Sequence, residues 1–189
     1  MQPINLTQNG SGFEQLANQT DQNLQHCYQC GKCTAGCPVA FTMDVAPNQI
    51  VRMLQLGLLN ETLQTETIWL CASCSTCSAR CPKGFDLAKL MDNLRQFAYK
   101  QGINPGGRGK KVSLFNRLFL DDLKKYGRAY EMGLMVRYNA NLMNPFKDAL
   151  VGLTLFSRGK LKIRPHRIKG TKDMIRIMEN IKRLEGDKV

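Results

Sequence analysis

All eight cysteines of the chain lie in one stretch and fall into two copies of the same pattern. The first copy runs from Cys27 to Pro38 and the second from Cys71 to Pro82. Each reads C-x2-C-x2-C-x3-C-P, with three evenly spaced cysteines and a fourth that is followed directly by proline. A region with this spacing has to fold around its thiol groups, so the pattern limits the fold more than any other feature of the sequence.

The spacing predicts two [4Fe–4S] clusters, because three thiolates two residues apart can ligate one cubane while the proline turns the fourth away. In proteins with two such clusters, the fourth cysteine of each motif ligates the other cluster. We therefore expect a first ligand set and a second ligand set. The first comprises Cys27, Cys30, Cys33 and Cys81, and the second comprises Cys71, Cys74, Cys77 and Cys37.

Three other uses of the cysteines fit less well. Zinc takes four ligands per ion, commonly from two separated C-x2–4-C pairs, and leaves the grouping of three plus one unexplained. A disulfide framework is typical of small secreted chains, and residues 1–5 contain no basic stretch leading into an apolar run that would indicate a signal peptide. A redox C-x-x-C pair does not need eight cysteines.

The length and the apolar runs predict a soluble, cytoplasmic protein. At 189 residues the chain is one domain or one domain with an extension. Its longest apolar run, residues 149–156, is well short of the ~20 residues that a membrane span needs. The cysteine-containing half is poor in large apolar residues, so its folding is expected to depend on the clusters.

Charge is distributed unevenly along the chain. Residues 1–99 carry six Lys and Arg against seven Asp and Glu, a net of −1, whereas residues 100–189 carry 21 against eight, a net of +13. Bound clusters would make the first half more negative still. A block of this kind is typical of a surface that docks or steers a partner.

The hydrophobic spacing predicts helices throughout, hence an all-α fold. A helix over 44–57 separates the motifs, and a helical segment over 61–69 leads into the second. Asp86 is expected to cap a helix whose apolar positions recur every three or four residues, and Ser113 and Thr171 to cap later ones. We expect three parts: a flexible N-terminal arm with a short helix (1–20), a ferredoxin domain (21–103) and a basic helical docking extension (104–189).

Two residues near the cysteines could be given a part in ligation or electron transfer, but a simpler interpretation is expected for each. His26 precedes a cysteine and is interpreted as a surface residue or one that supports a ligand. Trp69 is interpreted as packing that shields a cluster from water. The basic half lacks a recognition helix or an aromatic sheet motif for nucleic acid, so nucleic acid is not the expected partner. Apolar faces beside basic residues leave peripheral membrane contact open.

The two motifs and the helix between them resemble the α-helical ferredoxin domain of succinate dehydrogenase-type iron–sulfur subunits, and more closely the C subunit of heterodisulfide reductase. The resemblance covers residues 26–102. It is carried by Cys27–Pro38, Pro47–Gly57, Ile68–Pro82 and Leu94-Arg95. It implies a non-catalytic subunit of an oxidoreductase in sulfur metabolism. Such a chain relays electrons through two [4Fe–4S] clusters between the flavin-bearing A subunit of the complex and the B subunit, which acts on a disulfide or sulfur compound.

No catalytic residues are expected in this chain, because no P-loop, G-x-G-x-x-G or Ser–His–Asp set is visible. The C-x4-C-x2-C run of a [2Fe–2S] domain is also missing. Two alternatives remain: an iron–sulfur or zinc protein that uses its basic half on nucleic acid, and the iron–sulfur subunit of another succinate dehydrogenase-type oxidoreductase. The cations Lys32, Arg80 and Lys83 adjoin cluster ligands, and we expect them to raise the potential of the nearest cluster.

Overall fold

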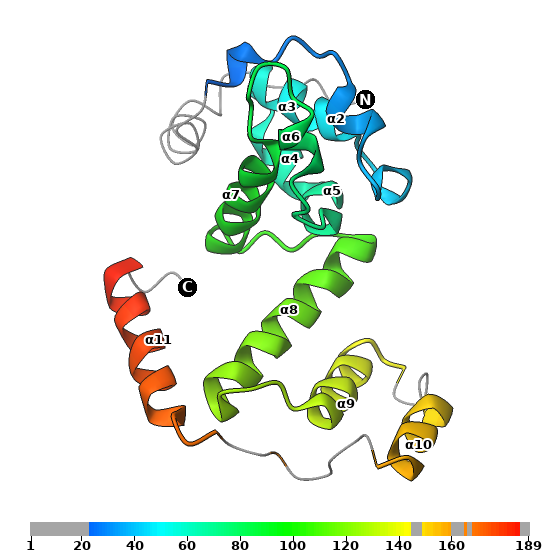
Figure 1. Ribbon diagram of the computed structural model, residues 1–189, viewed down its shortest axis with the longest axis vertical. Helices are drawn as coiled ribbons and strands as arrows, with labels where there is room; N and C mark the ends of the chain where they lie inside the picture. The colour runs from blue at the N-terminus through cyan, green and yellow to red at the C-terminus, as the bar shows by residue number, and fades with distance from the viewer. Residues whose placement is uncertain (1–22, 145–148, 160–164, 166–167, 186–189) are drawn as a thin grey trace. The chain divides into compact units, whose positions relative to one another are not determined.

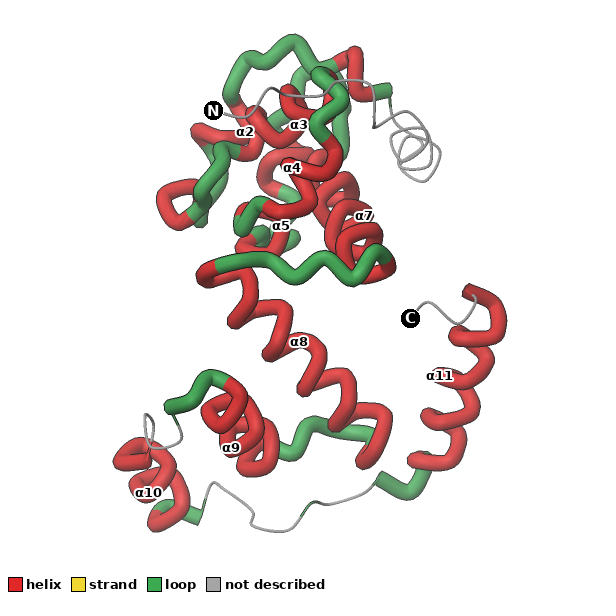
Figure 2. Tube along the Cα trace, turned by 180° about the vertical axis from the view of Figure 1, so that it is seen from behind, coloured by secondary structure: helices red, strands yellow, loops and turns green. Residues whose placement is uncertain are grey.

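The computed structural model describes residues 23–144, 149–159, 165 and 168–185, and this part of the chain is helical without strands (Figures 1 and 2). The predicted all-α fold is confirmed for it. The arm predicted for residues 1–20 lies outside the described residues. The chain divides into two compact units, with the division between Val112 and Ser113, and each unit is described by itself.

The first unit contains both cysteine motifs and is built from short helices. Its elements are η1 (Leu24–His26), α2 (Lys32–Ala35), η2 (Ala40–Thr42), α3 (Pro47–Gln55), α4 (Leu59–Gln64), α5 (Thr67–Leu70), α6 (Thr76–Ala79) and α7 (Leu87–Lys100). The one helical segment predicted over 61–69 is two helices, because Thr65 is extended (φ −66°, ψ 145°) and ends α4. This break brings the start of α5 against the loop at Asp44.

The core of the first unit lies where α3, α4, α5 and α7 pack together. Asp86 caps α7 as predicted, because its carboxylate accepts the backbone N–H of Lys89. The predicted apolar face of α7 is buried, and Leu90 and Leu94 are fully enclosed. Trp69 is also buried in this core, in agreement with its interpretation as a packing residue.

The second unit begins within a long helix. Its elements are α8 (Gly107–Tyr126, which starts in the first unit), α9 (Glu131–Asn141), α10 (Ala149–Ser157) and α11 (Thr171–Glu185). The prediction that Ser113 caps a helix is wrong, because α8 begins six residues earlier. The Glu66 carboxylate accepts the backbone N–H of Arg108 at 3.1 Å and supplies an acceptor for this helix end instead.

A buried carboxylate holds α8 and α9 together. Asp122 on α8 is fully buried, is paired with Arg137 on α9 and accepts the backbone N–H of Tyr130 at 3.3 Å. Phe115 and Tyr138 add an edge-to-face contact between the same two helices, with ring centroids 6.0 Å apart. Within the described ranges, no helix is both long and apolar enough to span a membrane.

Leu94→Ala should destabilise the first unit by about 2–5 kcal/mol, because it opens a cavity in the enclosed core. Urea unfolding of the cluster-loaded chain under anaerobic conditions, followed by far-UV circular dichroism, measures this loss. Leu56→Ala is the matched control, since Leu56 is 47% exposed in the same unit, and it should cost less than about 0.5 kcal/mol. Equal losses at the two positions would contradict the described core.

Candidate functional site

The two cysteine motifs fold into two turns of the same shape. In each motif, the residue before the second cysteine and the residue after it are left-handed. Gln29 (φ 61°) and Gly31 (φ 75°) hold these positions in the first motif, and Ser73 (φ 49°) and Ser75 (φ 58°) in the second. A single helical turn follows in both cases, α2 and α6, and these two turns pack against each other. The chain therefore doubles back between the cysteines, which turns backbone N–H groups toward the thiols.

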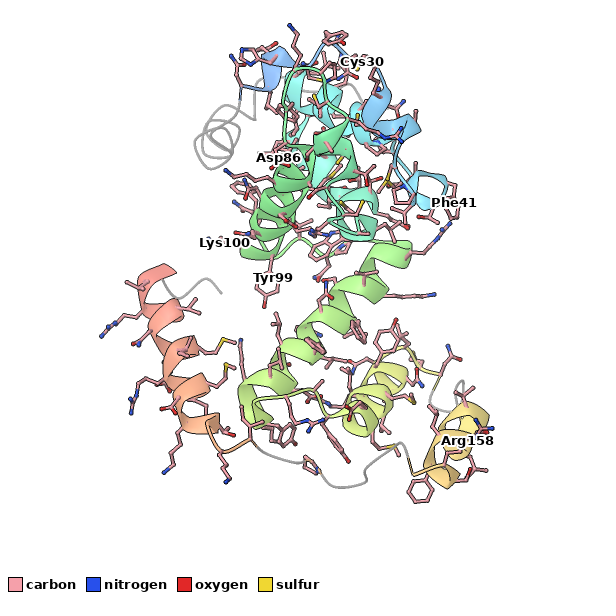
Figure 3. All side chains as sticks on the ribbon, in the orientation of Figure 1. Cys30, Phe41, Asp86, Tyr99, Lys100 and Arg158 are labelled. Atoms are coloured by element: carbon pink, nitrogen blue, oxygen red, sulfur yellow. The ribbon has the colours of Figure 1, made fainter. Side chains whose placement is uncertain are left out.

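The second cysteine of each motif lies at the surface and accepts hydrogen bonds (Figure 3 labels Cys30). The backbone N–H of Lys32, together with the Tyr28 hydroxyl, lowers the pKa of Cys30 below its ordinary value. The hydroxyl and the backbone N–H of Thr76 lower the pKa of Cys74 in the same way. At both positions the deprotonated form, which ligates metal, is thus easier to reach than in an ordinary cysteine.

The other sulfurs are partly enclosed. Burial raises the pKa of Cys33, Cys71 and Cys77, against opposing hydrogen bonds to their sulfurs. The backbone N–H of Phe85 donates to the Cys81 sulfur at 3.3 Å. A thiol that is half-buried and still provided with N–H donors is suited to a bound cluster, whose charge those donors stabilise.

A pocket of about 430 Å³, including space open to solvent, brings the first ligand set together. Its lining includes all four of the predicted thiols, Cys27, Cys30, Cys33 and Cys81, as well as Cys77, and the ring of Tyr28 and Lys83 lie at the same pocket. For the second ligand set, Cys37 acts electrostatically on Cys71, and Cys71 acts in the same way on Cys77, whereas Cys74 is exposed. Among the described residues, no three His, Cys, Asp or Glu side chains are arranged to hold a single metal ion.

The donor set fits [4Fe–4S] clusters. All eight cysteines are free of disulfides, they occur in two like turns, and hydrogen-bond donors point at the sulfurs of Cys27 and Cys81. The eight thiolates would hold the clusters, and the turns would provide the backbone N–H groups that cluster sulfur accepts.

A hydroxyl group in each motif fixes the helix that follows. The residue after the third cysteine is Thr34 in the first motif and Ser78 in the second. Thr34 Oγ1 accepts the backbone N–H of Asn48 at 3.1 Å, and Ser78 Oγ accepts that of Ala88 at 3.3 Å. Asn48 and Ala88 are each the second residue of their helix, α3 and α7. Both helices therefore start at a fixed place relative to the cysteines.

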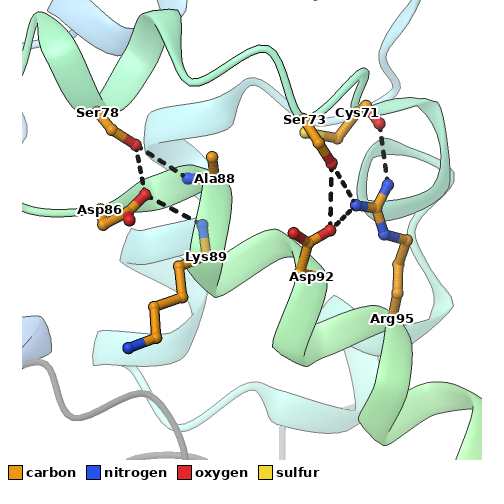
Figure 4. A network of polar contacts seen from close by, with 8 residues as sticks. All are labelled: Cys71, Ser73, Ser78, Asp86, Ala88, Lys89, Asp92 and Arg95. Carbon is orange, nitrogen blue, oxygen red and sulfur yellow. Dashed lines mark hydrogen bonds and ion pairs between the residues drawn. The ribbon is translucent and has the colours of Figure 1, made fainter.

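Each of these helices also reaches back to the first cysteine of its motif. Gln55 on α3 donates to the carbonyl oxygen of Cys27 at 2.9 Å, and Arg95 on α7 donates to that of Cys71 at 2.9 Å (Figure 4). Sequence reasoning missed this pair of contacts. The signal was present in that both residues stand at the same distance from the start of their helix.

Asp44 is a third residue that sequence reasoning missed. Its carboxylate accepts the backbone N–H groups of Glu66 and Thr67, both at 2.9 Å, and the Thr67 hydroxyl at 2.6 Å. It thereby caps α5, which runs directly into Cys71. Burial acts to raise the pKa of Asp44, but the hydrogen bonds from Thr67 and Glu66 outweigh it and hold this pKa below its ordinary value.

The other predicted neighbours of the ligands lie at the surface. His26 is exposed on η1. Lys32, Arg80 and Lys83 are exposed as well. The Lys83 ammonium lies 6.0 Å from the centroid of the Tyr28 ring, and the Arg80 side chain covers Gly36 so closely that a Cβ there would meet its Cδ at 2.5 Å.

Comparison with known proteins agrees with this site. Residues 23–85 match the 4Fe-4S dicluster domain. The chain is similar to the iron-sulfur C subunit of the CoB–CoM heterodisulfide reductase of Methanopyrus kandleri, with 39% identity over 80 residues, which is 42% of each chain. It is 41% identical over 92 residues to the C subunit of the ferredoxin:CoB–CoM heterodisulfide reductase of Methanosarcina acetivorans, covering 49% of this chain and 35% of that one.

A third relative is the C subunit of the H(2):CoB–CoM heterodisulfide,ferredoxin reductase of Methanothermobacter marburgensis, with 32% identity over 81 residues, 43% of this chain and 44% of that one. The matched region thus spans less than half the length of each of these relatives. The 4Fe-4S dicluster domain and the resemblance to this iron–sulfur subunit of heterodisulfide reductase, both expected from the sequence, are confirmed for this region.

Asp44→Asn should destabilise the chain by about 1–3 kcal/mol at pH 7, because the charged acceptor of several hydrogen bonds is lost. A lowered folded-state pKa gives stability that is present above the unfolded pKa and is lost as the pH falls through the folded value. The difference in the free energy of unfolding between Asp44→Asn and the unmodified chain should therefore persist down to about pH 4 and shrink below it. Urea unfolding recorded immediately after a pH jump, by far-UV circular dichroism, measures it.

Glu61→Gln is the matched control, since Glu61 is an exposed carboxylate on the neighbouring helix α4. It should change stability by less than about 0.5 kcal/mol at pH 7. A destabilisation by Asp44→Asn that does not diminish at low pH would contradict the role given to its charge.

Proposed function

We propose that this chain, whose residues 23–85 form a 4Fe-4S dicluster domain, is the electron-transfer subunit of a heterodisulfide reductase-like oxidoreductase complex. It would relay electrons through two [4Fe–4S] clusters between the flavin-bearing A subunit of that complex and its B subunit, which would act on a disulfide or sulfur compound. The observation that supports this most is the pair of like cysteine turns, with the four thiols of the first ligand set around one pocket.

The bound clusters supply one-electron redox chemistry. The residues of the chain hold and shield them. The cysteine turns present thiolates and backbone N–H groups, α3 and α7 fix the two turns through Thr34 and Ser78, and the buried core around Trp69 excludes water from one side. Cys30 and Cys74 lie at the surface, where a redox partner can come close to them.

The iron and sulfide content of anaerobically purified chain tests this proposal first. About eight iron and eight acid-labile sulfide per chain, with visible absorbance that dithionite bleaches reversibly, would support two clusters. A colourless chain with bound zinc would favour the alternative of a structural metal protein. Co-purification from the native cell, with identification of the partner chains and of flavin among them, tests the complex and separates it from another succinate dehydrogenase-type enzyme.

Exchanging single cysteines tests the crosswise ligation. Cys81→Ala should abolish the same electron paramagnetic resonance signal as Cys30→Ala, because both belong to the first ligand set. Cys37→Ala should abolish the same signal as Cys74→Ala. If Cys37→Ala instead removes the signal that Cys30→Ala removes, each motif ligates its own cluster and the two ligand sets have to be redrawn.

Lys83→Gln should lower the reduction potential of the cluster bound by the first ligand set by about 10–40 mV, the equivalent of an exposed charge interaction of ~0.2–1 kcal/mol. The reason is that Lys83 lines the same pocket as these thiols. A redox titration at low ionic strength measures the shift. Lys100→Gln, an exposed cation at the far end of α7, should leave both potentials unchanged. Unchanged potentials in Lys83→Gln would show that Lys83 does not raise the reduction potential of this cluster.

A further inference from the structure

The helices that follow the two motifs, α3 and α7, carry charged side chains at different positions along the helix. Counted from the helix start, the sixth and ninth residues are Arg52 and Gln55 on α3, and Asp92 and Arg95 on α7. On each helix these two side chains contact each other, one turn apart. The ninth residue also binds the carbonyl oxygen of the first cysteine of its motif. The two motifs thus share a contact that is neutral in one and cationic in the other.

In the first motif an amide faces the cysteine loop. Gln55 Nε2 donates to the carbonyl oxygens of Cys27 at 2.9 Å and Leu24 at 2.8 Å. The cation of this pair, Arg52, is exposed and donates to Gln55 Oε1 at 3.3 Å. Asn48 adds another neutral contact, because its amide donates to the Gln29 side chain at 3.1 Å. Neutral groups therefore make all of these contacts to the first cysteine loop.

In the second motif a guanidinium takes the same place (Figure 4). Arg95 Nη1 donates to the carbonyl oxygen of Cys71 at 2.9 Å, and Nη2 donates to Ser73 Oγ at 2.6 Å. Asp92 accepts from Arg95 and from Ser73, the latter at 3.1 Å. Arg95 and Asp92 on α7 thus form one hydrogen-bonded network with the Cys71 carbonyl oxygen and the Ser73 hydroxyl, around the loop between the first two cysteines of this motif.

The two charged side chains of this network, Arg95 and Asp92, differ in their exposure to solvent. The Arg95 side chain is 19% exposed and points into the loop, whereas that of Asp92 is 47% exposed. Water screens the carboxylate more than the guanidinium, so the pair does not cancel at the cysteine. The Arg95–Asp92 pair therefore leaves a net positive contribution at Cys71.

We propose that Arg95 is a tuning residue, which raises the reduction potential of the cluster held by Cys71 above the value that a neutral amide in its place would give. The proposal rests on the proposed function only in that the clusters must bind. The physical reason is that reduction adds one negative charge, which a nearby fixed cation stabilises. It holds whether Cys37 or Cys81 is the fourth ligand, because Cys71 belongs to the second motif in both cases.

Redox titration of the full-length, cluster-loaded chain, followed by electron paramagnetic resonance, tests the proposal. The signal that Cys74→Ala removes identifies the cluster of the second motif. At the midpoint potential of the unmodified chain, Arg95→Gln should lower the ratio of reduced to oxidised second-motif cluster about two- to tenfold. Arg95→Lys keeps the charge and should restore much of that ratio. The first-motif signal should stay in place in both variants.

Two further variants change the charge without removing Arg95. Asp92→Asn removes the opposing charge and should raise the same ratio. Gln55→Arg places a guanidinium at the equivalent position of the first motif and should raise the ratio for the first-motif cluster alone. Loss of packing would not move the two clusters in these opposite and separate ways, so the set distinguishes tuning from a structural role.

Ionic strength provides a further check. Arg95 is largely enclosed, so the effect of Arg95→Gln should persist at high salt, whereas an exposed charge would be screened. Unchanged second-motif potentials in both Arg95→Gln and Asp92→Asn, with both clusters present, would overturn the proposal while leaving the proposed function standing. A chain that binds no iron and sulfide would instead overturn the proposed function, and the two failures are therefore distinguishable.

Discussion

The left-handed backbone of the two cysteine turns is the constraint on which the rest of this structure depends. Three of its four residues, Gln29, Ser73 and Ser75, are not glycine, and each costs about 1–2 kcal/mol in this conformation. Something outside the turns has to offset that cost. The side chains of α3 and α7 contribute through hydrogen bonds to Gln29 and Ser73, and bound clusters would contribute further, because ligation that requires the fold stabilises it.

This constraint explains why the helices are placed as they are. Since Thr34 and Ser78 accept N–H groups at the start of the next helix, each motif determines where that helix begins. The helix in turn reaches the first cysteine through its ninth residue, so turn and helix fix each other. Asp44 adds a further link at the second motif, because it caps α5 immediately before Cys71. The buried leucines of α7 then join the assembly to its core.

The sequence was sufficient for the features that depend on local pattern. The cysteine spacing, the cap at Asp86 and the buried face of α7 all follow from residues a few positions apart. The break of the 61–69 segment at Thr65 and the start of α8 at Gly107 did not, because Asp44 and Glu66 satisfy these helix ends from outside the helices concerned. The contacts of Gln55 and Arg95 were missed because each residue binds a carbonyl oxygen far along the chain, and only their equal distance from the helix start relates them in the sequence.

The two motifs differ in how far the cations near them are exposed to solvent and to a docked protein. At the first motif the cations are Lys32 and Lys83, which are exposed and therefore subject to screening by salt and to contact with a docked protein. At the second motif Arg80 is exposed as well, whereas the loop and Asp92 hold Arg95 in a mostly enclosed position. A partner that covers the surface around Cys30 would thus alter the field of Lys32 and Lys83 and leave the field of Arg95 nearly unchanged. Two turns of one backbone shape thus lie beside two kinds of cation, exposed ones whose field a docked protein can change and an enclosed one whose field the fold itself determines.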